Sequence, residues 1–197
     1  MIVVDQPDGS LLLVRQRDHA AASGLIAQAW RRPTLVASQT WDRQIEAVRR
    51  HDDGWSAAEQ SPLLDPDGRP FDFKSIPTPQ HVALWRRSIE LAAQDDPYVA
   101  LLIAQHARWL YTTVGQDRIE DQRTAQRFAD ETAARIDGFI EQLSTGSQAE
   151  RAAVSPRGLG TARVLVAFFD ALSLALVGAC RHFNNRRCCR SAMRAPH

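Results

Sequence analysis

Apolar residues recur every three or four positions along most of this chain, and that spacing restricts it to a helical fold more strongly than any other feature. In residues 40–52, Trp41, Ile45 and Val48 are separated by steps of four and three. These steps place the three side chains on one face of a helix. The segment thus predicts an amphipathic helix that packs one face against a core.

Prolines and cap residues set the boundaries of the other expected helices. Thr78-Pro79 and Asp96-Pro97 each combine a capping side chain with a proline that the first turn of a helix tolerates. The segments predicted to be helical are residues 18–30 with Asp18 as N-cap, 40–52, the two stretches that begin at Thr78 and Asp96, 116–144, and 159–180.

Three segments are expected to be non-helical. Residues 2–5 and 11–16 are short apolar runs on either side of Asp8-Gly9, a pattern typical of a β-hairpin. Residues 56–78 hold four of the ten prolines and predict a long irregular segment that covers a functional site. Residues 145–158 are expected to be a polar loop. The fold class is therefore mostly α: a single helical domain over residues 1–179, with about six helices and a small N-terminal β-hairpin.

Composition separates the last 18 residues from the rest. The chain has 44% hydrophobic residues and a net charge of +1, so composition favours neither a nucleic-acid nor a membrane partner. Residues 180–197, however, contain five arginines, no acid and all three cysteines. This segment is interpreted as an aberrant basic tail that is disordered or read out of frame, with a genuine basic tail as the alternative. The preceding body has no thiolate with which to bind a metal.

The N-terminus lacks a basic stretch followed by an apolar one, so no signal peptide is expected. Residues 162–180 approach the length of a membrane span, but Asp170 lies in their middle and favours a buried core helix. We therefore expect a cytoplasmic protein with a small-molecule substrate and neither nucleic acid nor membrane as partner. The sequence carries no signal of an oligomeric state.

Histidines and aspartates lie at informative places in the predicted helices. Burying an aspartate in an apolar helix is costly unless the carboxylate is paired or binds a metal ion. Imidazoles with carboxylates suit Fe, Mn, Zn, Co or Ni. One or two such divalent ions are predicted, held by His19, His51, Asp52, His81, His106 and Asp170. Taken singly, each of these residues is more often explained without a metal: as a hydrogen-bonded core residue or, for His19, a solvated residue of the first helical turn and, for His51-Asp52, a helix end. As a set they would then be a buried network in a non-enzymatic helical binding module.

The order of these residues resembles that in the HD-domain superfamily of helical metal-dependent phosphohydrolases. Binuclear members carry a His, a His-Asp pair, two further His and a late Asp. The resemblance implies an HD-like helical site that hydrolyses a phosphate ester or a nucleotide-like substrate. The same ligand order is similar to the inositol oxygenase branch, which implies a di-iron oxygenase as another alternative.

A second resemblance rests on HDDGW at residues 51–55 and on neighbouring segments such as LLDPDGRPFDF at 63–73. These look like the bacterial family known as domain of unknown function 3891, which implies membership and no reaction. Asp52 and Asp53 of this motif are the candidate catalytic residues, Asp53 as a group that orients its neighbours. Trp55, Lys74 and Arg86 are the candidate substrate-binding residues, with packing or plain surface charge as the alternative for each.

Overall fold

The protein is described by a computed structural model that covers residues 1–34, 36, 38–114 and 121–183. Its two strands, β1 (Ile2–Asp5) and β2 (Leu11–Val14), form the predicted antiparallel hairpin, with Ile2 opposite Val14. Gly9 closes the turn at a φ of 82°, a left-handed conformation that glycine adopts without strain. The hairpin prediction is therefore confirmed.

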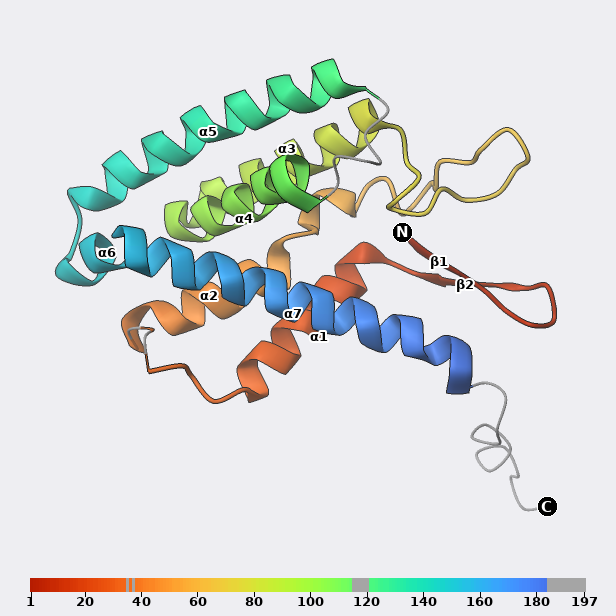
Figure 1. Ribbon diagram of the computed structural model, residues 1–197, viewed down its shortest axis with the longest axis horizontal. Coiled ribbons are helices and arrows are strands. Elements are labelled where there is room, and N and C mark those ends of the chain that lie inside the picture. Colours follow the sequence, from red (N-terminus) through yellow and green to blue (C-terminus); the bar gives the residue numbers. More distant parts are fainter. Residues whose placement is uncertain (35, 37, 115–120, 184–197) are drawn as a thin grey trace.

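Helices make up most of the remaining described chain, which confirms the mostly-α fold class. In order, they are α1 (Gln16–Ala29), α2 (Ser38–Arg50), a 3-10 helix (Asp53–Trp55), α3 (Thr78–Asp95), α4 (Pro97–Trp109), a π-helical turn (Leu110–Val114), α5 (Gln122–Ser144), α6 (Gln148–Ala153) and α7 (Pro156–Phe183). Figure 1 shows α5 above α3 and α4, and α7 crossing over α1 and α2.

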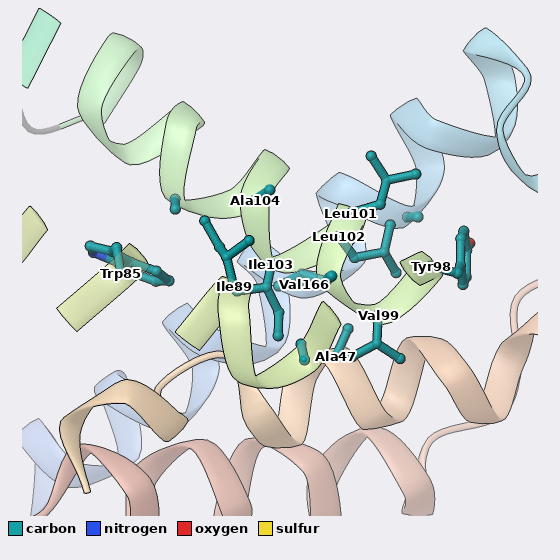
Figure 2. Close-up of a cluster of buried hydrophobic side chains, with 14 of the residues drawn as sticks. Ala47, Trp85, Ile89, Tyr98, Val99, Leu101, Leu102, Ile103, Ala104 and Val166 are labelled. Carbon is teal, nitrogen blue, oxygen red and sulfur yellow. The ribbon is translucent and has the colours of Figure 1, made fainter. Parts of the chain in front are cut away.

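Helix α4 is the centre of the hydrophobic core. Residues 99–104 of this helix are at most 1% exposed, and α4 packs against α2, α3, α5 and α7. Figure 2 shows Leu102 and Ile103 of α4 together with Ile89 of α3 and Val166 of α7. Because α4 is covered on every side, a polar group on it has to find its partners inside the protein.

Several predicted boundaries differ from the structure. Thr78 is the first residue of α3 and not its cap, since Pro77 holds the N-cap position, and α5 begins at Gln122 rather than at residue 116. Asp18 does not cap α1, because the helix begins two residues earlier with Arg15 at the N-cap, and Asp18 instead pairs with Arg15 at 2.8 Å. Residues 145–158 are not a loop throughout. They contain α6, which Ser147 and Glu150 start with a capping box, and the first turn of α7. The polar composition that suggested a loop belongs to a short exposed helix.

Helix α7 buries one stripe and exposes the other. Ala162, Val166, Phe169 and Ser173 are at most 2% exposed, whereas Val164 is 59% exposed. The expectation of a core helix therefore holds for one face only. Its segment Pro156–Gly178 is long and apolar enough to cross a membrane, with a mean hydropathy of 1.7. The helix continues to Phe183, past the predicted boundary at residue 180; the tail residues 184–197 lie outside the described part of the chain.

The HDDGW segment packs unusually closely on α3. The backbone amide of Gly54 donates a hydrogen bond to Ser88 Oγ at 2.9 Å. A Cβ at position 54 would overlap the carbonyl oxygen of Leu84 and lie 2.7 Å from the backbone nitrogen of Ser88. Only glycine therefore allows the 3-10 helix to approach α3 at this distance.

We expect Gly54→Ala to lower the free energy of unfolding by about 3 kcal/mol, because the added methyl group meets rigid backbone. Gly138→Ala in α5 is the matched control, since a Cβ there meets nothing within 4 Å and alanine favours a helix by about 1 kcal/mol over glycine. Urea denaturation of both variants measures the difference. Equal stability of the two variants would contradict the close packing at Gly54.

Candidate metal centre

Five of the six predicted metal ligands converge at one place in the core. They come from four separate parts of the fold, which are α1, the turn after α2, α4 and α7. Two groups have ligand atoms that all lie within 4.8 Å of one another. The first group is His19, His51 and Asp52, and the second is His51, His106 and Asp170. His51 belongs to both groups and therefore joins them into one cluster.

Asp170 is the centre of this cluster. Its carboxylate lies 2.9 Å from His19 Nε2 and 3.1 Å from His106 Nε2, and its Oδ1 is 3.7 Å from His51 Nε2. Burial alone would raise the pKa of Asp170, but hydrogen bonds from these three histidines outweigh it and hold the pKa well below its usual value. Asp170 is therefore an ionised carboxylate in an apolar helix.

His51 presents a nitrogen to two carboxylates. Its Nδ1 lies 2.7 Å from the carbonyl oxygen of Val48, an acceptor, so Nδ1 carries a proton and donates it. Nε2 then faces Asp52 at 3.3 Å and Asp170 at 3.7 Å. Burial would lower the pKa of His51, yet Asp52 and Asp170 raise it well above its usual value. The site therefore favours a cation at Nε2, whether a proton or a metal ion.

The other two imidazoles of the cluster differ in how their second nitrogen is held. His19 Nδ1 lies 2.9 Å from Ser173 Oγ, a contact that fixes its ring. Ser173 also contacts the carbonyl oxygen of His19 at 3.2 Å. His106 Nδ1 is buried and has no hydrogen-bond partner among the described residues. His19 is thus oriented from both sides, and His106 only through Asp170.

His81 belongs to neither group, although it was predicted as a metal ligand. Its Nε2 lies 3.2 Å from Trp85 Nε1, and its Nδ1 lies 2.9 Å from the hydroxyl of Tyr111. An indole N–H can only donate, so Nε2 of His81 accepts. Burial lowers the pKa of His81 to about 4, and the ring is therefore neutral at pH 7, with its proton on Nδ1. Both ring nitrogens are already engaged in hydrogen bonds.

A cavity of about 330 Å³ opens onto the cluster. His51, Asp52 and Asp170 lie in its lining, as does His81. The irregular segment before α3 contributes Phe73, Lys74 and Ile76, in agreement with the expectation that residues 56–78 cover a site. The other residues that line the cavity are Gln16, Thr78, Trp85, Trp109, Leu110, Tyr111, Ala167, Ala171 and Leu174. A cavity of this size accepts a small molecule.

The structure places the remaining predicted residues unequally. Lys74 lines the cavity, whereas Asp53, Trp55 and Arg86 do not. Asp53 pairs with Arg50 at 2.9 Å and Arg86 pairs with Glu131 at 2.6 Å, both away from the cavity lining. Trp55 is 4% exposed and packs its ring against His81. Asp53 and Arg86 are thus engaged in ion pairs, and Trp55 packs behind His81, which lines the cavity.

Sequence reasoning did not identify Tyr111, Trp109 or Ser173. Ser173 could have been found because it lies three residues after Asp170, on the same face of one helix. Trp109 follows His106 at the same spacing, and their rings lie 6.0 Å apart. Tyr111 lies in the π-helical turn after α4. The sequence gives no local signal for that turn, so the position of Tyr111 could not be predicted.

The fold and the cluster define a mostly helical protein whose buried histidines and aspartates could hold a metal ion. Residues 1–187 match a family model described as protein of unknown function (DUF3891), and the chain belongs to that family. No curated protein matches the chain, and neither does any solved structure. The family prediction is therefore confirmed, and the resemblance to HD-domain phosphohydrolases stays a prediction.

The depressed pKa of His81 predicts a pH dependence of stability. Between pH 6.5 and 4 the unfolded chain binds a proton on this residue that the folded protein does not. Stability therefore falls as the pH falls, by about 2 kcal/mol from pH 6.5 to 5. The raised pKa of His51 acts in the opposite direction, since its stabilisation is lost as the pH rises above 6.5. The stabilisation from the lowered pKa of Asp170 is lost only as the pH falls below 3.8.

Urea unfolding at pH 6.5 and pH 5 measures the effect, with His81→Gln as the comparison. The variant lacks the titrating group, so its stability should change by about 2 kcal/mol less between the two pH values than that of the unaltered protein. The same change in both proteins would show that His81 does not remain neutral in the folded state.

Proposed function

We propose that this protein is a metal-dependent hydrolase that acts on a phosphate ester. The observation that carries the proposal is His51 Nε2, whose neighbours at 3.3 and 3.7 Å are the carboxylates of Asp52 and Asp170. Two buried carboxylates around one imidazole nitrogen need a positive charge between them. A divalent ion meets this need, and the lining of the cavity by the same residues gives a small molecule access to it.

The donor atoms fit a borderline or hard divalent ion such as Fe, Mn, Zn, Co or Ni. His19, His51 and Asp52 would hold one ion, and His106 with Asp170 would complete the site or bind a second ion through the shared His51. When bound, such an ion supplies Lewis-acid activation of water and of the ester. Oxygen and nitrogen donors without thiolates are typical of catalytic rather than structural sites.

The chain's own residues would orient the metal ligands and supply a base. The carbonyl oxygen of Val48 and the hydroxyl of Ser173 fix the rings of His51 and His19, so that each Nε2 stays directed at the cluster. Asp52, which is 2% exposed, is the candidate base because it lines the cavity beside His51. Aromatic side chains, among them Trp85 and Trp109, line the cavity beside the cluster.

A non-enzymatic binding module is the second candidate, and one observation favours it. His19 and His106 already bond the two oxygens of Asp170, so this carboxylate is satisfied by protein groups alone. In that case the histidines would stabilise the helix packing and the cavity would bind a ligand without reaction. The two candidates differ in whether stability depends on metal.

We expect the protein, purified without a polyhistidine tag, to bind one or two equivalents of a transition metal. A metal at 100 times its Kd should stabilise the fold by about 2.7 kcal/mol. His51→Ala should abolish this gain, because His51 belongs to both groups of ligands. Asp53→Asn is the matched control, since its carboxylate pairs with Arg50 outside the cavity lining and the gain should persist.

Mass spectrometry of metals and melting curves with and without added metal are the measurements. Less than about a tenth of an equivalent of metal, with no stabilisation on addition, would leave the binding module as the function. Bound iron with oxygen consumption, and no release of phosphate from esters, would instead identify the oxygenase alternative.

A further inference from the structure

The walls of the cavity are mostly aromatic and aliphatic. Phe73, Trp85, Trp109 and Tyr111 contribute aromatic surface, and the aliphatic lining residues are Ile76, Leu110, Leu174 and two alanines of α7. Flat apolar walls favour a ligand with a flat apolar body. Besides Lys74 and the cluster, the polar side chains that line the cavity are Gln16, Thr78, His81 and Tyr111, and both ring nitrogens of His81 are already engaged. A sugar with several hydroxyl groups would therefore leave some of them without partners on entry.

Outside the His/Asp cluster, positive charge in the lining is restricted to one flexible side chain. Lys74 is the single lysine of the chain, and none of the chain's arginines lines the cavity within the described residues. Its backbone is fixed by Asp72 Oδ1, and its ammonium lies 5.2 Å from the ring centre of Phe73. The described residues include no carboxylate that pairs with this ammonium. Lys74 is therefore available to one anionic group of a ligand. The negative charge of a chain of phosphates would exceed the single positive charge of this ammonium.

Tyr111 supplies a hydrogen-bond donor. Because Trp85 donates to His81 Nε2, the proton of the neutral ring lies on Nδ1 and is donated to the Tyr111 oxygen. The hydrogen of the Tyr111 hydroxyl then has no acceptor among the described residues. Burial raises the pKa of Tyr111, so the hydroxyl keeps this hydrogen. Because Tyr111 lines the cavity, a ligand oxygen can accept it.

We propose that the ligand of this cavity is a small aryl phosphate, bound through Lys74 and the Tyr111 hydroxyl and held between the aromatic walls. In naming this ligand as the substrate, the inference rests on the proposed hydrolase function. The binding itself depends on the cavity alone. The volume of about 330 Å³ accommodates one aromatic ring system with a single phosphate.

Binding of probes to the metal-free protein tests the ligand class without turnover. The probes are 1-naphthylmethylphosphonate, methylphosphonate, 1-naphthylmethanol and adenosine 5′-monophosphate, titrated by calorimetry into the chelator-treated full chain. The naphthyl phosphonate should bind at least about tenfold more tightly than each of the other three, since each lacks the charge or the flat apolar body or adds a sugar. Equal affinity for adenosine monophosphate, or no binding of the naphthyl phosphonate, would overturn the inference.

Variants test the two polar contacts. Lys74→Gln and Tyr111→Phe should each weaken binding of the naphthyl phosphonate by about tenfold. Lys74→Gln should leave binding of 1-naphthylmethanol unchanged, because this alcohol carries no charge. Arg87→Gln, an exposed cation outside the cavity lining, and Tyr98→Phe, whose hydroxyl bonds Gln44 in the core, are the matched controls and should bind as the unaltered protein does. Unchanged affinity in both Lys74→Gln and Tyr111→Phe would overturn the assignment.

The same titrations separate this inference from the proposed function. If the naphthyl phosphonate binds with the predicted order of affinities but the metal-loaded protein does not hydrolyse 1-naphthyl phosphate, the hydrolase proposal fails and the ligand class holds. If the metal-loaded protein hydrolyses glycerol phosphate as fast as 1-naphthyl phosphate and the naphthyl phosphonate does not bind, the ligand class fails and the hydrolase proposal holds.

Discussion

A largely buried carboxylate surrounded by imidazoles is the interaction on which the rest of this structure depends. Asp170 lies in an apolar helix, where an ionised group without partners would be strongly destabilising. Its partners His19 and His106 are brought to it by α1 and α4, and His51 follows the end of α2. Four segments are thus held in register by one side chain. The hydrophobic core around α4 supplies most of the apolar burial, and Asp170 specifies how its helices are oriented.

The site has two parts with different chemistry. The polar cluster joins α1, the turn after α2, α4 and α7, and the cavity wall adds α3, the π-helical turn, the irregular segment before α3 and apolar residues of α7. His81 belongs to the wall, since its hydrogen bonds run to Trp85 and Tyr111. Gly54 links the parts, because the close approach that it allows fixes the turn containing His51 and Asp52 against α3.

The helical fold could be predicted because periodic apolar positions and prolines are local signals. The hairpin, α2 and the start of α4 at Asp96 follow from such signals alone. The cluster could also be predicted as a set, since a buried Asp170 in an apolar run requires partners and the histidines were the available ones. What could not be predicted is the separation of His81 from the other five predicted ligands, because its partner Tyr111 lies 30 residues away in a π-helical turn.

The distance along the chain between the partners of Asp170 has a consequence for how the protein folds. His19 and Asp170 are 151 residues apart, so their bond closes a loop of nearly the whole described chain. Closing a loop of this length costs about 4 kcal/mol of chain entropy, and it cannot be repaid until both end helices have docked. No fragment that lacks either α1 or α7 can therefore contain the complete cluster. In the folded protein the same bond connects the first helix, α1, directly to the last described helix, α7.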